Sequence, residues 1–146
     1  MLAIICGGGE YPLSIAQCCV KNNTDFVLAF VDGSFNDKYD WPDVTSAKFS
    51  IGEIGALIDF LNNNHVQKII FAGHINRPNL FDLSLDSVGS EWLMKIGISA
   101  FSGDDALLKK IAELFEREGF TVVQPTQFLQ SLTVSSYLMT PKNRQI

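Results

Sequence analysis

The sequence predicts an α/β domain of three layers, with a mainly parallel sheet and helices on both faces. Short apolar runs, each ending at glycine or polar residues, alternate with segments whose apolar residues recur at helical spacing. The first run leads directly into a glycine-rich turn followed by a helix, Cys6-Gly7-Gly8-Gly9-Glu10-Tyr11-Pro12. With 146 residues and 47% hydrophobic residues, the chain is long enough to form one domain with its own core.

The first elements are two buried strands and the helix between them. Leu2–Cys6 and Phe26–Val31 are apolar runs typical of strands that are covered on both faces. Residues 12–22 carry apolar side chains at helical spacing. The polar, turn-rich segment 32–45 predicts a long loop, and Ala47–Ile51 predicts a short strand after it.

The middle of the chain continues the alternation. Ser50-x-x-Glu53 has the form of a capping box and predicts a helix that ends in the asparagine run 62–64. Lys68–Ala72 predicts the next strand, and residues 79–101 have the character of a helical excursion.

The last part of the chain predicts one strong helix and one short strand. Ser102-x-x-Asp105 is a second capping-box form, and Gly119 suits the end of the helix that follows it. Thr121–Val123 predicts the final strand, and we expect a short helical or irregular piece after Pro125. The domain is expected to span residues 1–140, and residues 141–146 are expected to be the start of a linker or a frayed tail.

Composition narrows the function classes. A net charge of −5, with no basic cluster longer than Lys109-Lys110, argues against nucleic acid as a partner. No apolar stretch of about 18 residues predicts a membrane span, and no basic region precedes the first strand as in a secretory signal. Three cysteines, of which Cys18 and Cys19 are adjacent, do not suggest a disulfide framework. These features favour the cytoplasm as the location of the protein.

The carboxyl ends of parallel strands face one edge of a sheet, where open α/β sheets bind ligands. Four glycine-rich or polar loops are expected at this edge: Gly7–Tyr11, Asp32–Phe35, Gly52-Glu53 and Gly73–Pro78. In the first loop, Gly7, Gly8 and Gly9 would let backbone N–H groups approach a phosphate, and the helix behind them adds further donors. A tight turn between strand and helix without any ligand is the alternative explanation.

Two further groups are candidates for ligand contacts. Gly73, His74, Asn76 and Arg77 follow a buried strand, and a guanidinium is well suited to clamping phosphate. Alternatively, His74 caps the end of the strand and Arg77 pairs with a surface carboxylate. Asp104 and Asp105 open the long helix, where carboxylates either cap the helix or contact a hydroxyl or a magnesium ion.

Several motifs taken together resemble the amino-terminal, Rossmann-like domain of the UDP-2,3-diacylglucosamine pyrophosphatase family of lipid A synthesis. They are Cys6-Gly7-Gly8-Gly9-Glu10-Tyr11-Pro12, Ile51-Gly52-Glu53-Ile54-Gly55, Phe71-Ala72-Gly73-His74-Ile75-Asn76-Arg77-Pro78 and Gly103-Asp104-Asp105-Ala106-Leu107-Leu108. The resemblance implies a hydrolase that forms UMP and 2,3-diacylglucosamine 1-phosphate with Mg²⁺. It also implies a carboxy-terminal domain that carries the catalytic acids and has no counterpart in this sequence.

The resemblance therefore favours a substrate-binding half of an enzyme, which we expect to be inactive without the second domain. Whether this chain has enzyme activity is left open. No catalytic residue and no metal ligand are assigned to it. Expected partners are the UDP-sugar lipid substrate, the missing domain or a second copy, and at most the periphery of the inner membrane. A stand-alone nucleotide-binding or regulatory module without catalysis is the alternative. An NAD-dependent enzyme is disfavoured, because the acid that such sites carry about 20 residues after the glycines lacks its usual context here. Asp32, at the end of the second strand, is the one serious candidate for that role.

Overall fold

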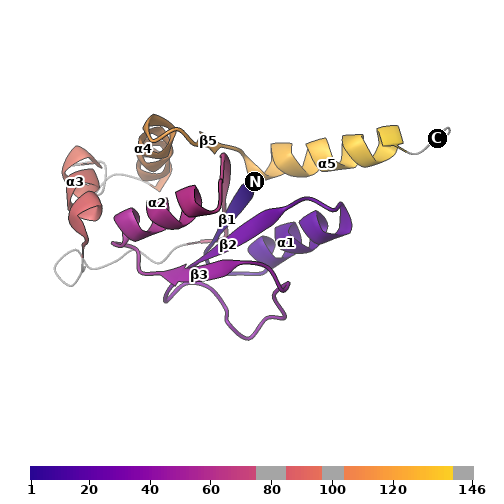
Figure 1. Ribbon diagram of the computed structural model, residues 1–146, viewed down its shortest axis with the longest axis horizontal. Helices are drawn as coiled ribbons and strands as arrows, with labels where there is room; N and C mark the ends of the chain where they lie inside the picture. Colours follow the sequence, from indigo (N-terminus) through magenta and orange to yellow (C-terminus); the bar gives the residue numbers. More distant parts are fainter. Residues whose placement is uncertain (75–84, 97–103, 140–146) are drawn as a thin grey trace.

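A computed structural model of the chain describes residues 1–74, 85–96 and 104–139, with the backbone alone described for 104–108 and 133–139. Its centre is a five-stranded sheet in the order β3-β2-β1-β4-β5, with every pair parallel (Figure 1). The strands are β1 (Leu2–Cys6), β2 (Phe26–Val31), β3 (Ser46–Phe49), β4 (Lys68–Ala72) and β5 (Thr121–Val122). The predicted three-layer α/β fold is confirmed.

Five helices are described: α1 (Tyr11–Lys21), α2 (Ile54–Asn63), α3 (Ser87–Ile96), α4 (Asp104–Arg117) and α5 (Pro125–Met139). Two separate clusters of buried side chains show which helices cover which face of the sheet. Residues of α2, α3 and α4 join one face, and residues of α1 and α5 join the other (Figure 1). No described helix is long and apolar enough to cross a membrane.

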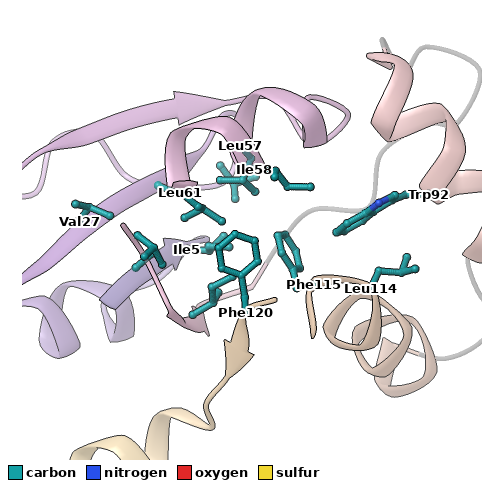
Figure 2. Close-up of a cluster of buried hydrophobic side chains, with 14 residues drawn as sticks. Ile5, Val27, Leu57, Ile58, Leu61, Trp92, Leu114, Phe115 and Phe120 are labelled. Atoms are coloured by element: carbon teal, nitrogen blue, oxygen red, sulfur yellow. The ribbon is translucent and has the colours of Figure 1, made fainter. Parts of the chain in front are cut away.

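The larger cluster is built around Phe115 of α4, which is 1% exposed (Figure 2). The ring of Trp92 from α3 meets Phe115 edge-on, with ring centroids 4.8 Å apart, and Phe71 of β4 lies 5.6 Å away. Leu57, Ile58 and Leu61 of α2 belong to the same cluster. The buried stripe of α4 therefore ties two helices to the sheet, as its helical periodicity predicts.

The long loop between β2 and β3 is held down by aromatic packing. Phe30 of β2 stacks on Phe35 with ring centroids 4.6 Å apart, and its other neighbour, Trp41, meets it edge-on at 4.9 Å. The indole Nε1–H of Trp41 donates to the carbonyl of Asn36 at 2.9 Å. The loop predicted over residues 32–45 is thus an ordered cover on the α1 side of the sheet.

The start of α2 differs from the predicted capping box. The backbone N–H of Ser50 donates to the carboxylate of Glu53 at 2.8 Å, which is one half of the box. However, Glu53 itself is the N-cap, and α2 begins at Ile54. The missing half is supplied from elsewhere, because the carboxylate of Asp86 accepts the N–H of Ala56 at 3.2 Å. β3 ends at Phe49, where Ile51 was predicted.

Asp86 also caps α3, and it was missed in the sequence. Its second carboxylate oxygen accepts the N–H of Gly89 at 2.7 Å, so one side chain serves the first turns of two helices. A Cβ atom on Gly89 would overlap the carbonyl oxygen of Gly52, so glycine is required for this close approach. An aspartate just before an apolar helical segment was the available signal.

The carboxy-terminal helix is longer than expected. α5 has 15 residues, where a short helical or irregular piece was predicted. Pro125 stands at its first position, where the fixed φ of proline favours helix initiation. Phe128 and Leu129 pack against the α1-side cluster, and Figure 1 shows the helix running away from the sheet toward the end of the chain.

Some predicted segments are described only in part. α3 falls inside the predicted helical excursion 79–101, whose remaining residues 79–84 and 97–101 lie outside the described part. Ser102 and the predicted tail 141–146 also lie outside it.

Candidate functional site

The strand order creates one point at the sheet edge where the chain changes direction. From β1 the chain adds β2 and β3 on one side and then returns to add β4 and β5 on the other. The carboxyl ends of β1 and β4 are therefore neighbours whose following loops diverge, which is where doubly wound sheets bind ligands. The loop after β1 contains Gly7, Gly8 and Gly9, and the loop after β4 begins with Gly73 and His74.

These two loops are joined by backbone hydrogen bonds. The N–H of Gly8 donates to the carbonyl of His74 at 2.7 Å, and the N–H of His74 donates back to the carbonyl of Gly8 at 3.2 Å. The N–H of Gly7 donates to the carbonyl of Ala72 at 2.8 Å. The two loops thus form one connected element at the end of β1 and β4.

Glycine is required at this junction because the two backbones touch. A Cβ atom on Gly7 would overlap the carbonyl oxygen of His74, and one on Gly73 would overlap the carbonyl oxygen of Gly8. Gly73 also has a φ of 82°, which disfavours residues with side chains. These two glycines therefore have a packing role, which accounts for them without any ligand.

The imidazole of His74 lies against Gly8. A Cβ atom on Gly8 would come within 2.8 Å of the imidazole Nε2 and also within 2.8 Å of the carbonyl oxygen of Ser34. Loops from β1, β2 and β4 thus meet at Gly8. His74 is solvent-exposed, so its ring is accessible where the loops Gly7–Tyr11 and Gly73-His74 meet. This meeting point corresponds to the crevice at the carboxyl edge of doubly wound sheets.

The free donors in the crevice belong to the start of α1. The N–H groups of Gly7 and Gly8 are already donated within the protein, whereas those of Gly9, Glu10 and Tyr11 find no acceptor among the described residues. Glu10 is the N-cap, but its side chain makes no capping hydrogen bond. All three residues are exposed. An anion bound here would meet these N–H groups and the positive end of the helix dipole.

The fourth loop expected at this site has a different neighbour. Gly52 and Glu53 follow β3, which is the edge strand on the far side of β2. The carbonyl of Gly52 accepts the N–H of Asp86 at 3.3 Å, and Glu53 is bonded to Ser50. Among the described contacts, this loop joins α2 to α3 and makes none with the glycine turn.

The remaining candidates are only partly visible. Asn76 and Arg77 lie outside the described residues. Asp104 and Asp105 are the first residues of α4, and their side chains also lie outside the description. The part they play in the site stays a prediction.

Cys6 and Cys19 are buried core residues without an activated thiol. Burial raises the pKa of the Cys6 thiol to about 12, and its Sγ lies 3.5 Å from the carbonyl of Ile4. Burial, with a smaller contribution from Cys18, raises the pKa of Cys19 to about 12 as well. Thiols of this kind are protonated at neutral pH and are poor nucleophiles.

The described side chains provide no complete metal site. Across residues 1–74, 85–96 and 104–139, no three carboxylate, imidazole or thiol side chains whose positions are described come together as a ligand set. The hollows described lie elsewhere. One of roughly 510 Å³ lies between the last turns of α1 and Trp41, and one of roughly 370 Å³ lies between α2 and the start of α3.

Comparison with known proteins identifies the family. The model of the LpxI N-terminal domain matches residues 1–132. The chain belongs to the LpxI N-terminal domain family. A curated relative, UDP-2,3-diacylglucosamine pyrophosphatase LpxI from Caulobacter vibrioides, is 31% identical over 137 residues, which is 91% of this chain and 47% of the relative. The chain thus spans about half the length of that relative, and the family inferred from the sequence motifs is confirmed.

Proposed function

We propose that this chain is the substrate-binding half of an enzyme that hydrolyses the pyrophosphate of UDP-2,3-diacylglucosamine in lipid A biosynthesis. Its products would be UMP and 2,3-diacylglucosamine 1-phosphate. Membership of the LpxI N-terminal domain family carries the proposal, because the relative is named for this activity. The crevice is chemically suited to it, since a diphosphate is an anion and the start of α1 offers three N–H donors that have no acceptor among the described residues.

The roles within the crevice follow from the available groups. The N–H groups of Gly9, Glu10 and Tyr11 would contact the diphosphate, while Gly7, Gly8 and Gly73 would hold the loops close enough to present them. His74 would line the wall beside Gly8. Asn76 and Arg77 follow directly in the sequence and would supply an amide and a permanent positive charge.

The chemistry itself is proposed to require a second domain. The relative is about twice as long as this chain, which leaves room for a second domain in the complete enzyme. We therefore assign no catalytic residue and no Mg²⁺ ligand to the described part. Dependence on Mg²⁺ belongs to the proposal for the complete enzyme, and Asp104 and Asp105 remain candidates for the rim of the site or for holding the metal.

Two further contacts belong to the same proposal. The apolar acyl chains of the substrate would bring the protein to the membrane surface, where it would associate peripherally in the cytoplasm. The surface that meets the second domain would include the rim of the crevice, because the substrate is proposed to lie between the two halves. A homodimer is the other arrangement that would cover this rim.

The proposal is tested by titrating ¹⁵N-labelled protein with UDP, with and without Mg²⁺, and following the amide signals. We expect saturable shifts at Gly9–Tyr11 and at Gly73-His74, with the amides of Gly55 and Ala56 at the start of α2 unchanged. Uridine, which lacks the phosphates, is the matched control ligand and should shift the α1 amides little. Absence of any shift at millimolar UDP would contradict nucleotide binding by this half.

A further inference from the structure

Asp32 has no role in the site as described so far, although it lies at the carboxyl end of a central strand. It is the first residue after β2, and β2 is the neighbour of β1 in the sheet. Its carboxylate is exposed, and no described residue forms an ion pair or hydrogen bond with it. The backbone turns sharply just after it, because the N–H groups of Ser34 and Phe35 both donate to the carbonyl of Val31, at 3.1 and 3.2 Å.

The alternation of β2 assigns Asp32 to the face of the sheet that α1 covers. Phe26 and Leu28 belong to the α1-side cluster, and Phe30 packs against it, whereas Val27, Ala29 and Val31 belong to the other cluster. The N–H of Asp32 donates to the carbonyl of Phe49 at 2.8 Å, so the ladder with β3 continues up to this residue. Asp32 is therefore the next residue on the α1 side.

The loop that carries Asp32 also touches the glycine turn. The carbonyl oxygen of Ser34, two residues later, lies within 2.8 Å of the place where a Cβ of Gly8 would stand. The carboxylate thus lies on a loop that adjoins the turn into α1, on the same face as this helix. At that helix start, the N–H groups of three exposed residues have no acceptor among the described residues.

A carboxylate in this place is suited to a different part of the ligand from the one that α1 would bind. It repels a diphosphate, since both groups are negative, but it accepts hydrogen bonds from hydroxyl groups. Vicinal hydroxyls lie a short distance beyond the diphosphate in every ribonucleoside diphosphate. Acidic residues at the end of the second strand hold such hydroxyls in other doubly wound domains.

We infer that Asp32 binds the ribose hydroxyls of the nucleotide and so fixes the direction in which the substrate lies. The nucleoside then lies over β2 and the diphosphate at the start of α1. The remainder of the substrate extends toward β4 and the loop of His74. This inference rests on the proposed function and adds a specificity determinant to it: the chain selects ribonucleotides over nucleotides that lack ribose hydroxyls.

The experiment compares UDP with 2′,3′-dideoxy-UDP on the wild-type chain and on two variants, Asp32→Ala and Asp32→Asn. The matched control is Asp25→Asn, because Asp25 is an exposed aspartate just before the other end of the same strand. Affinities come from the amide titration. Circular dichroism and thermal melting of each variant establish that it is folded.

In the wild type we expect the dideoxy ligand to bind roughly tenfold to a hundredfold more weakly than UDP, as hydrogen bonds to a charged acceptor imply. Asp32→Ala should lower the affinity for UDP to about the level of the dideoxy ligand and leave little difference between the two ligands. Asp32→Asn should show a smaller loss, because one acceptor oxygen remains. Asp25→Asn should behave as the wild type.

Two results overturn the inference, and they differ in what they leave standing. If the wild type binds UDP and Asp32→Ala still prefers UDP over the dideoxy ligand by the wild-type ratio, the role of Asp32 is wrong while nucleotide binding stands. If the wild type binds neither ligand at millimolar concentration, both the role of Asp32 and nucleotide binding by this half are wrong.

Discussion

Two regions of the molecule can be compared: the crevice at β1 and β4, and the junction of α2 with α3. Both depend on a glycine at a close backbone contact, but they differ in how the start of the helix is capped. In each, a glycine lets two backbones touch: Gly7 against the carbonyl of His74 and Gly89 against the carbonyl of Gly52. At the junction, Asp86 then satisfies N–H groups of both helices. At the crevice, no described side chain does this for α1. The comparison separates a helix start that the protein caps with its own side chain from one that receives no cap from the described side chains.

The backbone of Glu10 helps to explain why α1 remains uncapped. Its φ and ψ of −89° and −15° are helical, whereas a side chain that caps its own helix needs an extended backbone at that position. The start of α2 also receives no cap from the side chain of its own N-cap residue, but Asp86, the residue just before α3, caps it instead. Solvent or an anion is therefore left to satisfy the first donors of α1.

The largest expected effect is on the free energy of unfolding, when a methyl group is added at the crevice. Gly7→Ala should lower the free energy of unfolding by at least about 2 kcal/mol, because its Cβ would force the bridged loops apart. Gly9→Ala is the matched control: its Cβ would have no neighbour within 4 Å, so only the φ of 92° opposes it, at a cost of about 1 kcal/mol. Urea unfolding measures both. Equal losses would contradict the close approach at Gly7.

The next effect tests the junction. Asp86→Ala should lower the free energy of unfolding by about 2 kcal/mol, since it removes a cap from two helices at once. Its UDP affinity should be unchanged. Asp59→Ala, an exposed aspartate on α2 beside the same hollow, should lose little stability. A loss of UDP affinity in Asp86→Ala would show that the two regions are coupled.

At the crevice we expect a loss of UDP affinity without a loss of stability. Arg77→Ala should weaken UDP binding by roughly tenfold through loss of a charge-assisted hydrogen bond, with the melting temperature unchanged. Arg117→Ala, an exposed arginine in the last turn of α4, serves as the control and should bind UDP normally. A large drop in the melting temperature of Arg77→Ala, with binding retained, would mean that Arg77 has a structural role.

The smallest effect concerns the buried end of β1 beneath the glycine turn. Because burial raises the pKa of Cys6 from 9.0 to about 12, the thiol ionises in the unfolded chain before it does so in the folded one. Its contribution to stability is full below pH 9 and is lost as pH rises toward 12, by about 1 kcal/mol at pH 10. Urea unfolding between pH 8 and 10.5 should therefore show a shallower decline in Cys6→Ala than in the wild type. Identical declines would indicate that water reaches this thiol.

Most of the fold was predictable because local patterns agree with the tertiary structure. The strands Leu2–Cys6, Phe26–Val31 and Lys68–Ala72 were predicted with the bounds that the structure gives them. Each is a continuous apolar run, as expected for strands covered on both faces. The start of α2 was misplaced because half of its cap comes from Asp86, which is 30 residues away in the chain from Ala56. Local patterns carry no information about such a partner.

The meeting of the loops after β1 and β4 was predictable, whereas the contacts within these loops were not. The alternation of strands and helices, with the rule that ligands bind at the carboxyl edge, was enough to select the loops at Gly7 and Gly73. Which N–H groups face outward was not, because the amides of Gly7 and Gly8 are taken by carbonyls from the β4 side. The loop at Gly52 was expected at the same edge, but its described partner is Asp86.

The sequence by itself determined the alternation of strands and helices, the apolar faces and the motifs of the family, since these depend on the order and spacing of neighbouring residues. Only the tertiary structure decided which glycines are needed for close approach, which donors stay open at α1, and which face of the sheet Asp32 belongs to. Those properties depend on contacts between segments far apart in the chain. Hydrogen bonds and steric overlap act over a few ångströms, and only the folded chain brings their partners within that range.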